Sequence, residues 1–309
     1  MKSLIIGTRG SALALWQANH VKSLIEIKTK TPCEIKVIST HGDEDQSTPL
    51  PEVGDKGFFT AEIEAELLIG TIDLAVHSMK DLPVDLGADF RIGAVPKRFS
   101  YRDVMVTNSP MNFENLPKNP IIATGSLRRE LQIKSLQHDI ETIDVRGNIH
   151  TRIKKLKDNN WDGLIMAEAA IKRLELDVHY YKFTNDEMTP AAGQGAVAVQ
   201  VNKSRNDLDQ ILSKINHNPS SMSIEIERQI ISTLEGGCKT PVGCLASIKK
   251  NDLKIDAYLS NITGTQAIRI SESGQLSDKD DIINNIITAF MDEGAQDIIS
   301  ANRKVLDNA

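Results

Sequence analysis

Cysteines and long apolar runs are scarce in this chain of 309 residues. Its three cysteines, Cys33, Cys238 and Cys244, do not have the spacing of metal ligands, and their odd number leaves at least one thiol free. Charged residues interrupt every hydrophobic segment well before the roughly 20 apolar residues that a membrane-spanning helix needs. The sequence therefore predicts neither a metal site nor a spanning helix, and it leaves at least one thiol free for chemistry.

An excess of positive charge is also missing, because 36 lysines and arginines stand against 42 aspartates and glutamates. A general binder of nucleic acid or of membrane surfaces would need such an excess, so neither partner is expected. Any anion site must then be a local cluster of arginines. The apolar run before Gly7 is much shorter than the hydrophobic region of a signal peptide, and we expect a cytoplasmic protein.

The remaining composition is that of an ordinary globular protein, and the length allows two or three domains. Residues 4–7 predict a short buried strand, followed by a glycine turn and a helix for which Ser11 is a plausible N-cap. A similar unit recurs about 116 positions later, at 121–126, before a helix that carries Arg128 and Arg129. Two α/β domains of similar plan would explain the repeat.

Further strands and helices alternate along the chain. We expect strands at 34–40, 72–77, 142–145, 164–167 and 196–201, and helices at 60–69 and 149–157. The alternation predicts an open, largely parallel or mixed sheet in each domain, with ligands beyond the carboxyl ends of the strands. The C-terminal part predicts a small α+β domain, with a helix at about 221–234, strands at 253–259 and 267–271, and a helix at 280–291.

Six arginines occupy loops or first helical turns that follow predicted strands. They are Arg9, Arg128, Arg129, Arg146, Arg152 and Arg173. A guanidinium grips a carboxylate with two parallel hydrogen bonds, and helix N-termini add backbone N–H donors. Any one of these arginines can equally be a solvated loop residue, but their shared location favours a site for a polyanionic small ligand.

Three loops could carry chemistry. Asp81, after the strand at 72–77, can stabilise a cation that develops on an N–H heterocycle, or it can simply cap the turn before Pro83. Cys238 follows two glycines and precedes Lys239, a setting that favours thiolate, although a buried inert cysteine is the usual alternative. The loop at 54–60, with Lys56 and Phe59, is either a mobile loop that offers a cation or an ordinary solvated one.

Several segments together resemble the porphobilinogen deaminase (hydroxymethylbilane synthase) family. They occur in family order from end to end, at 7–17, 75–83, 124–129, 146–148, 193–196 and 234–238. The resemblance implies two α/β domains like those of a type II periplasmic binding protein, with the active site between them, and a small C-terminal α+β domain. The implied domains are residues 1–96 with 197–216, residues 97–196, and residues 217–309.

The resemblance also implies the chemistry. Cys238 would form a thioether to a dipyrromethane cofactor, and four porphobilinogen molecules would be joined to it with release of ammonia, as in tetrapyrrole and heme biosynthesis. Asp81 would be the catalytic carboxylate. The implied cofactor contacts are Ser78, Lys80, Asp81, Thr124, Ser126, Arg128, Arg129, Arg146, Gly147 and Cys238. The implied substrate contacts are Arg9, Ser11, Gln17, Lys56, Phe59, Arg146, Arg152, Arg173 and Gln194.

The loop that contains Lys56 departs from the family pattern, because Glu52 and Asp55 make it less cationic than usual. We expect this loop to act as a lid, and the resemblance favours a monomer. Two other hypotheses use the same residues. One is a solute-binding or effector-sensing module, in which Cys238 has no role. The other is an acyl-transfer enzyme that pairs Cys238 with His77 or His150.

Overall fold

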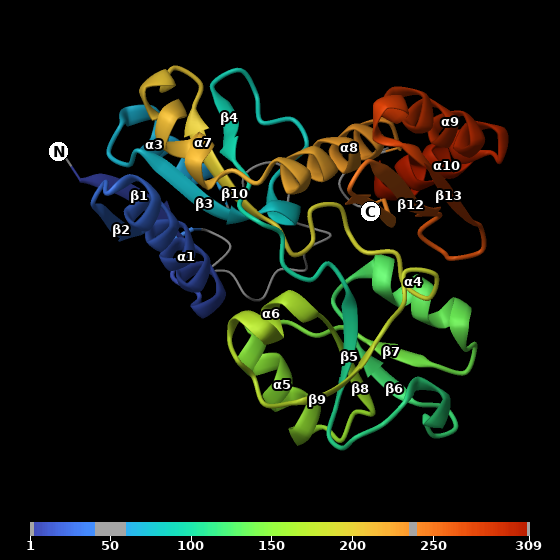
Figure 1. Cartoon of the computed structure of the whole chain (residues 1–309). Helices are drawn as coiled ribbons and strands as arrows, with labels where there is room; N and C mark the ends of the chain where they lie inside the picture. Colours follow the sequence, from blue (N-terminus) through green and yellow to red (C-terminus); the bar gives the residue numbers. More distant parts are fainter. Residues whose placement is uncertain (1–2, 41–59, 235–239, 308–309) are drawn as a thin grey trace. The chain divides into compact units, whose positions relative to one another are not determined.

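The computed structural model describes residues 3–40, 60–234 and 240–307. Lys56, Phe59 and Cys238 lie outside these ranges. The chain forms two compact units, which are coloured by sequence in Figure 1. The first unit comprises Met1–Phe99, Lys172–Glu175 and Gly193–Met222, and the second comprises Ser100–Ile171, Leu176–Ala192 and Ser223–Ala309.

The first unit is built on a mixed sheet. In the part of it that is described, five strands lie in the order β2-β1-β3-β10-β4. Their bounds are β1 Leu4–Thr8, β2 Cys33–Val37, β3 Leu74–Ser78, β4 Phe90–Ala94 and β10 Val197–Asn202. Strand β1 runs parallel to β2 and β3, whereas β10 runs antiparallel to β3 and β4. The carboxyl ends of β1 and β3 therefore share one edge of the sheet.

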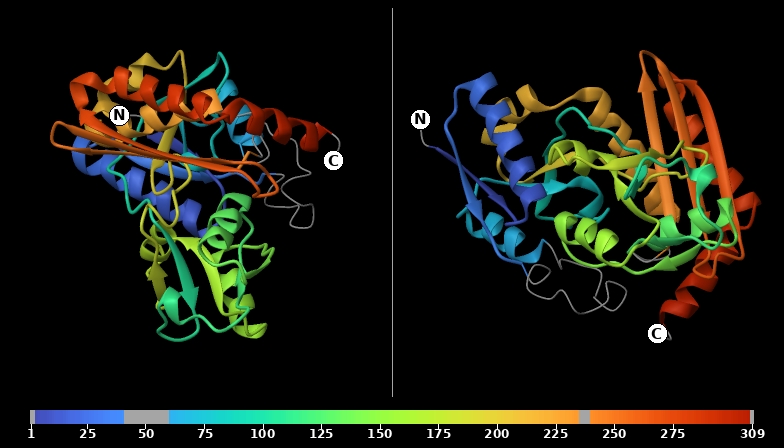
Figure 2. Two further views of the ribbon diagram at one scale, coloured as in Figure 1. Left: turned by 90° about the vertical axis from the view of Figure 1, so that its right-hand side faces the viewer. Right: turned by 90° about the horizontal axis from the view of Figure 1, so that it is seen from below.

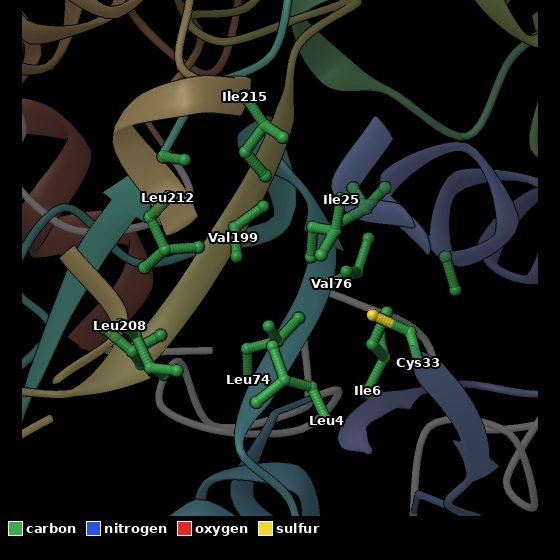
Figure 3. Packing of buried hydrophobic residues seen from close by; sticks show 14 of the residues in the cluster. Leu4, Ile6, Ile25, Cys33, Leu74, Val76, Val199, Leu208, Leu212 and Ile215 are labelled. Atoms are coloured by element: carbon green, nitrogen blue, oxygen red, sulfur yellow. The ribbon is translucent and has the colours of Figure 1, made fainter. Parts of the chain in front are cut away.

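Helices α1 (Ala12–Thr29), α3 (Ala61–Ile69) and α7 (Asp209–Ile215) pack on this sheet. Helix α1 begins as the sequence predicts, because the side chain of Ser11 accepts a hydrogen bond from the backbone N–H of Ala14 at 3.2 Å. Its buried face carries Val21 and Ile25, which pack with strand residues such as Leu74 and with α7 (Figure 3). This apolar contact holds the second half of α1 against the sheet.

The second unit repeats the plan of the first. Its described strands lie in the order β7-β6-β8-β5-β9. Their bounds are β5 Asp103–Thr107, β6 Ile121–Ala123, β7 Glu141–Ile143, β8 Gly163–Ala167 and β9 His179–Lys182. Strand β6 runs parallel to β7 and β8, and β5 runs antiparallel to β8 and β9. The expected pair of similar α/β domains is confirmed, with β6 in the place of β1.

Three helices follow the parallel strands of this second sheet: α4 (Leu127–Leu136), α5 (Ile149–Asp158) and α6 (Glu168–Arg173). The last two residues of α6 belong to the first unit. Apolar clusters fill both faces of the sheet, one around Leu156 and Leu164 and another around Ile122 and Ile133. Burial on both faces matches a parallel sheet covered by helices.

The C-terminal part of the second unit is the expected small α+β domain. Its antiparallel sheet consists of β11 (Val242–Lys249), β12 (Asp252–Ser260) and β13 (Ala267–Gln275), joined in that order. Its helices are α8 (Asn218–Leu234), which begins in the first unit, α9 (Lys279–Asp292) and α10 (Ala295–Asp307). Figure 2 shows α9 lying along the sheet. Within the described ranges, no helix has the length and apolar character needed to cross a membrane.

Candidate active site

The carboxyl ends of β1 and β3 gather several of the predicted residues of the first unit. Arg9 and Ser11 follow β1, and Ser78 ends β3. The side-chain amide of Gln17, on α1, donates a hydrogen bond to the hydroxyl of Ser78 at 2.8 Å. The single turn Met79–Asp81 follows at once and leaves the carboxylate of Asp81 exposed to solvent. The structure therefore brings these side chains to one edge of one sheet.

A tight segment at 193–196 supports this turn. Gly193 has a φ of +72°, and a Cβ atom there would lie 2.5 Å from Met79 Cγ and 3.1 Å from the backbone nitrogen of Lys80. The N–H of Met79 donates to the carbonyl of Ala196 at 3.1 Å. Only glycine tolerates both this φ and this close approach. Gln194 is fully buried in the same segment.

Arg173 is a buried cation whose positive charge is not neutralised by a carboxylate among the described residues. Its side chain lies 4.7 Å from the ring centroid of Phe99 and 5.4 Å from that of Trp16, and one Nη donates to the carbonyl of Gly195 at 2.8 Å. Burial lowers the pKa of Arg173 to about 10. Among the described residues its Nε has no hydrogen-bond partner and no carboxylate pairs with it, so a ligand carboxylate would supply the missing counter-charge.

The ring of His20 contacts the same two aromatic side chains. Its ring stacks on Trp16 at 5.1 Å and meets Phe99 edge to face at 5.6 Å. Burial and the neighbouring charge of Arg173 both lower the pKa of His20. Neutral imidazole is thereby favoured next to the guanidinium, which limits repulsion between the two groups.

In the second unit, the predicted residues follow β6 and β7, which are parallel neighbours. Thr124 and Ser126 lie between β6 and α4, and the hydroxyl of Thr124 accepts a hydrogen bond from the N–H of Ser126 at 3.2 Å. Arg146 lies between β7 and α5, and its Nε donates to Asp144 at 3.1 Å. Gly147 follows with a φ of +109°. These residues therefore share the edge at which the helices begin.

Asn148 caps the helix that follows Gly147. Asn148 accepts a hydrogen bond from the N–H of Thr151 at 2.9 Å. The Nε of Arg152 donates to the carbonyl of Gly147 at 2.7 Å. Arg146 and Arg152 thus lie on either side of the start of α5, and the backbone of Gly147 helps to orient Arg152.

Arg128 and Arg129 are held inside the second unit by one carboxylate. Asp103 is fully buried, with its oxygens 3.0 Å from Arg128 Nη2 and 2.8 Å from Arg129 Nη2. Burial lowers the pKa of Arg128, while the charge of Asp103 opposes that change. The two guanidiniums and the carboxylate therefore form one buried charged group beside the start of α4. Sequence reasoning missed Asp103, although a charged residue that opens the apolar run 103–107 was a usable signal.

Lys56, Phe59 and Cys238 cannot be placed, because they lie outside the described residues. Of the two histidines considered as partners of a thiol nucleophile, His150 is exposed on α5 and His77 is buried in β3. Burial lowers the pKa of His77 to about 4, so its ring is neutral at pH 7.

Two sheets whose parallel strand ends present arginines, with a carboxylate after β3, define an α/β protein suited to bind an anionic small molecule. Comparison with known families makes the assignment specific. Residues 4–210 match the porphobilinogen deaminase, dipyromethane cofactor binding domain, and residues 222–286 match the porphobilinogen deaminase, C-terminal domain. The chain belongs to the porphobilinogen deaminase family, as its resemblance implied.

Relatives match along nearly the whole chain. Porphobilinogen deaminase from Helicobacter acinonychis is 38% identical over 301 residues, which cover 97% of this chain and 98% of the relative. That from Syntrophomonas wolfei is 39% identical over 306 residues, which cover 98% and 100%. A substrate-binding domain of an amino acid ABC transporter from Streptococcus pneumoniae is similar at a TM-score of 0.44 and 13% identity, covering 75% of this chain and 98% of that domain.

Members of this family are transferases that join four porphobilinogen molecules head to tail on a dipyrromethane cofactor, in tetrapyrrole biosynthesis. Each pyrrole of the substrate and of the cofactor carries an acetate and a propionate. The donor set described above fits such groups, since buried guanidiniums bind carboxylates best when their own compensation is incomplete. The Nε of Arg173, which has no partner in the described part of the chain, is the clearest case.

We expect Gly193→Ala to lower porphobilinogen turnover about tenfold or more, because the added methyl group would displace the Met79–Asp81 turn. Gly87→Ala is the matched control: Gly87 has a φ of +75°, but no described atom lies within 4 Å of the place that a Cβ would take. Both variants bear a similar backbone strain of about 1 kcal/mol. Steady-state kinetics and thermal unfolding of both variants check the prediction, and equal losses of turnover would contradict it.

The buried ring of His77 predicts a pH dependence of stability. Its pKa is about 4 in the folded chain, against 6.5 for an unperturbed histidine, so between these values the unfolded chain binds more protons. The free energy of unfolding therefore falls as the pH drops below 6.5, by about 2 kcal/mol between pH 7 and pH 5 from this group. Urea unfolding should show a weaker pH dependence in His77→Asn than in the wild type. His138→Asn, at an exposed site, should keep the full dependence.

Proposed function

We propose that this chain condenses four porphobilinogen molecules onto a dipyrromethane held by a thioether at Cys238, with Asp81 as its catalytic carboxylate. The observation that supports this most directly is the buried guanidinium of Arg173. Among the described residues its Nε has no hydrogen-bond partner and no carboxylate pairs with it. A reaction that adds two carboxylates with each pyrrole would use such a cation repeatedly.

The dipyrromethane, when bound, supplies the nucleophilic pyrrole carbon from which the chain grows. The residues proposed to hold it are those after β3, β6 and β7 together with the tether, namely Ser78, Lys80, Asp81, Thr124, Ser126, Arg128, Arg129, Arg146, Gly147 and Cys238. Guanidinium groups and backbone N–H donors at helix starts match its carboxylates. The amide of Gln17 orients the hydroxyl of Ser78 for such a contact.

Asp81 is proposed to act on the substrate. Its exposed carboxylate can accept a hydrogen bond from the pyrrole N–H of porphobilinogen and stabilise the positive charge that develops as ammonia leaves. The Gly193 segment holds the backbone of this turn in place. Because the reaction builds charge on the ring nitrogen, an anion fixed beside that atom lowers the barrier.

Substrate binding is proposed for a second set of residues, several of them charged: Arg9, Ser11, Gln17, Lys56, Phe59, Arg146, Arg152, Arg173 and Gln194. For Gln194 the support is indirect, since its side chain is buried and its carbonyl accepts a hydrogen bond from Arg98 at 2.9 Å. Its role is then to shape the segment that carries Gly193 and Gly195. Closure of the loop around Lys56, the three-domain division and a monomeric state are further proposals that rest on the family resemblance. A cytoplasmic location is a further proposal that rests on the short apolar run before Gly7.

The thioether makes a prediction about mass. Intact-protein mass spectrometry of the purified wild type should show the amino-acid mass plus two porphobilinogen-derived units, and Cys238→Ser should lose this addition. Cys244→Ser is the control, because Cys244 is buried in the C-terminal sheet and should keep it. Active wild type without added mass would contradict the proposal.

The same preparation separates the alternative functions. A binding module would carry no adduct. An acyl-transfer enzyme would present Cys238 as a reactive thiol, whereas a thioether sulfur resists alkylation. The described cysteines should react little in this alkylation experiment, since Cys33 and Cys244 are buried and burial raises the pKa of Cys33 to about 11.

For Asp81→Asn we expect turnover to fall by a factor of about 100 or more, with the fold and the attached cofactor retained. The amide keeps the size of the side chain but cannot stabilise a cation as a carboxylate does. Steady-state kinetics, thermal unfolding and intact mass test the three parts separately. Asp85→Asn, at an exposed position in the loop after this turn, is the control. Near-normal turnover of Asp81→Asn would remove this residue from the mechanism.

A further inference from the structure

Thr189 is the centre of a hydrogen-bond network in the second unit. Its carbonyl accepts from Arg128 Nη1 at 2.6 Å and from the amide of Gln132 at 3.1 Å, and its N–H donates to Gln132 Oε1 at 2.8 Å. Thr189 and Gln132 are both buried. Gln132 lies one helical turn after Arg128 on α4 and grips both backbone polar groups of Thr189. The position of the Arg128 guanidinium therefore depends on Asp103 at Nη2 and, at Nη1, on where Gln132 holds Thr189.

Arg269 reaches this network from β13. One of its Nη atoms donates to Gln132 Oε1 at 2.9 Å, and the other donates to the hydroxyl of Thr189 at 3.1 Å. Its guanidinium lies 4.8 Å from the ring centroid of Tyr258 on β12. The fork of an arginine thus spans the two residues that fix Arg128.

Strand β11 presses on the same segment. A Cβ atom at Gly243 would lie 2.8 Å from the carbonyl oxygen of Thr189, and the N–H of Cys244 donates to the carbonyl of Pro190 at 2.9 Å. In sequence, Gly243 comes five positions after Cys238. The segment at 189–190 is therefore in contact with α4 on one side and with the sheet that follows Cys238 on the other.

We propose that Gln132 and Arg269 are positioning residues. They hold Thr189, which accepts a hydrogen bond from Arg128, and they thereby fix the Arg128 guanidinium relative to the C-terminal sheet, which follows Cys238 in the sequence. This inference rests on the proposed function of Arg128 and Cys238. In the proposed reaction, neither Gln132 nor Arg269 contacts the reacting atoms. Their effect passes through Arg128, which distinguishes them from residues that only stabilise the fold.

Arg269→Met is the main test, since Arg269 is exposed and its loss leaves the protein core intact. Two quantities are measured: the rate at which cofactor-free chain gains the mass of the dipyrromethane from added porphobilinogen, and the turnover of loaded enzyme. We expect Arg269→Met to lower both about tenfold, Arg269→Lys to restore part of the loss, and the melting temperature to change little. Arg303→Met, exposed on α10, is the control and should leave both unchanged.

A double-mutant cycle separates positioning from general stability. If Arg269 acts through Arg128, adding Arg269→Met to Arg128→Lys should cost less than a further factor of about two in either rate. Full additivity would overturn the inference, as would an Arg269→Met variant that loads cofactor and turns over like the wild type. Gln132→Met should show the same non-additivity. A wild type that consumes no porphobilinogen would overturn the proposed function and this inference together, whereas an active wild type with an unaffected Arg269→Met would overturn the inference alone.

Discussion

The buried carboxylate of Asp103 is the interaction on which the second unit depends. It opens β5 and pairs with Arg128 and Arg129 from the first turn of α4. Two guanidiniums cannot be buried side by side without an anion, because the cost of removing each from water exceeds what neutral hydrogen bonds return. Asp103 offsets part of that cost for both arginines. The strand, the helix start and the two guanidiniums therefore form one arrangement.

The two units stabilise their buried arginines with different groups. Arg128 and Arg129 share a carboxylate, whereas Arg173 relies on the rings of Trp16 and Phe99 and on one carbonyl. A ring face attracts a cation without neutralising it, so Arg173 keeps its charge at the expense of a lowered pKa. Such a site gains most from a ligand carboxylate. A net charge of −6 therefore does not exclude a local cluster of buried cations.

The sequence predicted the parts of the fold that local patterns encode. Ser11 caps its helix as expected, and β1 and β6 occupy equivalent places in their sheets. It missed β5 even though Asp103 opens an apolar run there, and it missed β9 because the side chains of that strand are half exposed. Strands β4 and β11 and helices α6, α7 and α10 were missed as well. Their stability comes from packing against segments distant in sequence, which a short stretch of sequence does not reveal.

The predicted site shows the same limit. The positions of Arg9, Asp81 and Arg146 at strand ends follow from the alternation of strands and helices, so pattern and resemblance were enough to find them. What surrounds those residues was not predictable, because Asp103 lies 25 positions from Arg128, and Arg269 reaches Gln132 across 137 positions. Contacts of that separation exist only once the sheets have formed. They nevertheless decide which guanidinium hydrogens remain for a ligand. The local sequence pattern therefore predicts where each arginine lies, whereas the tertiary structure determines its chemistry.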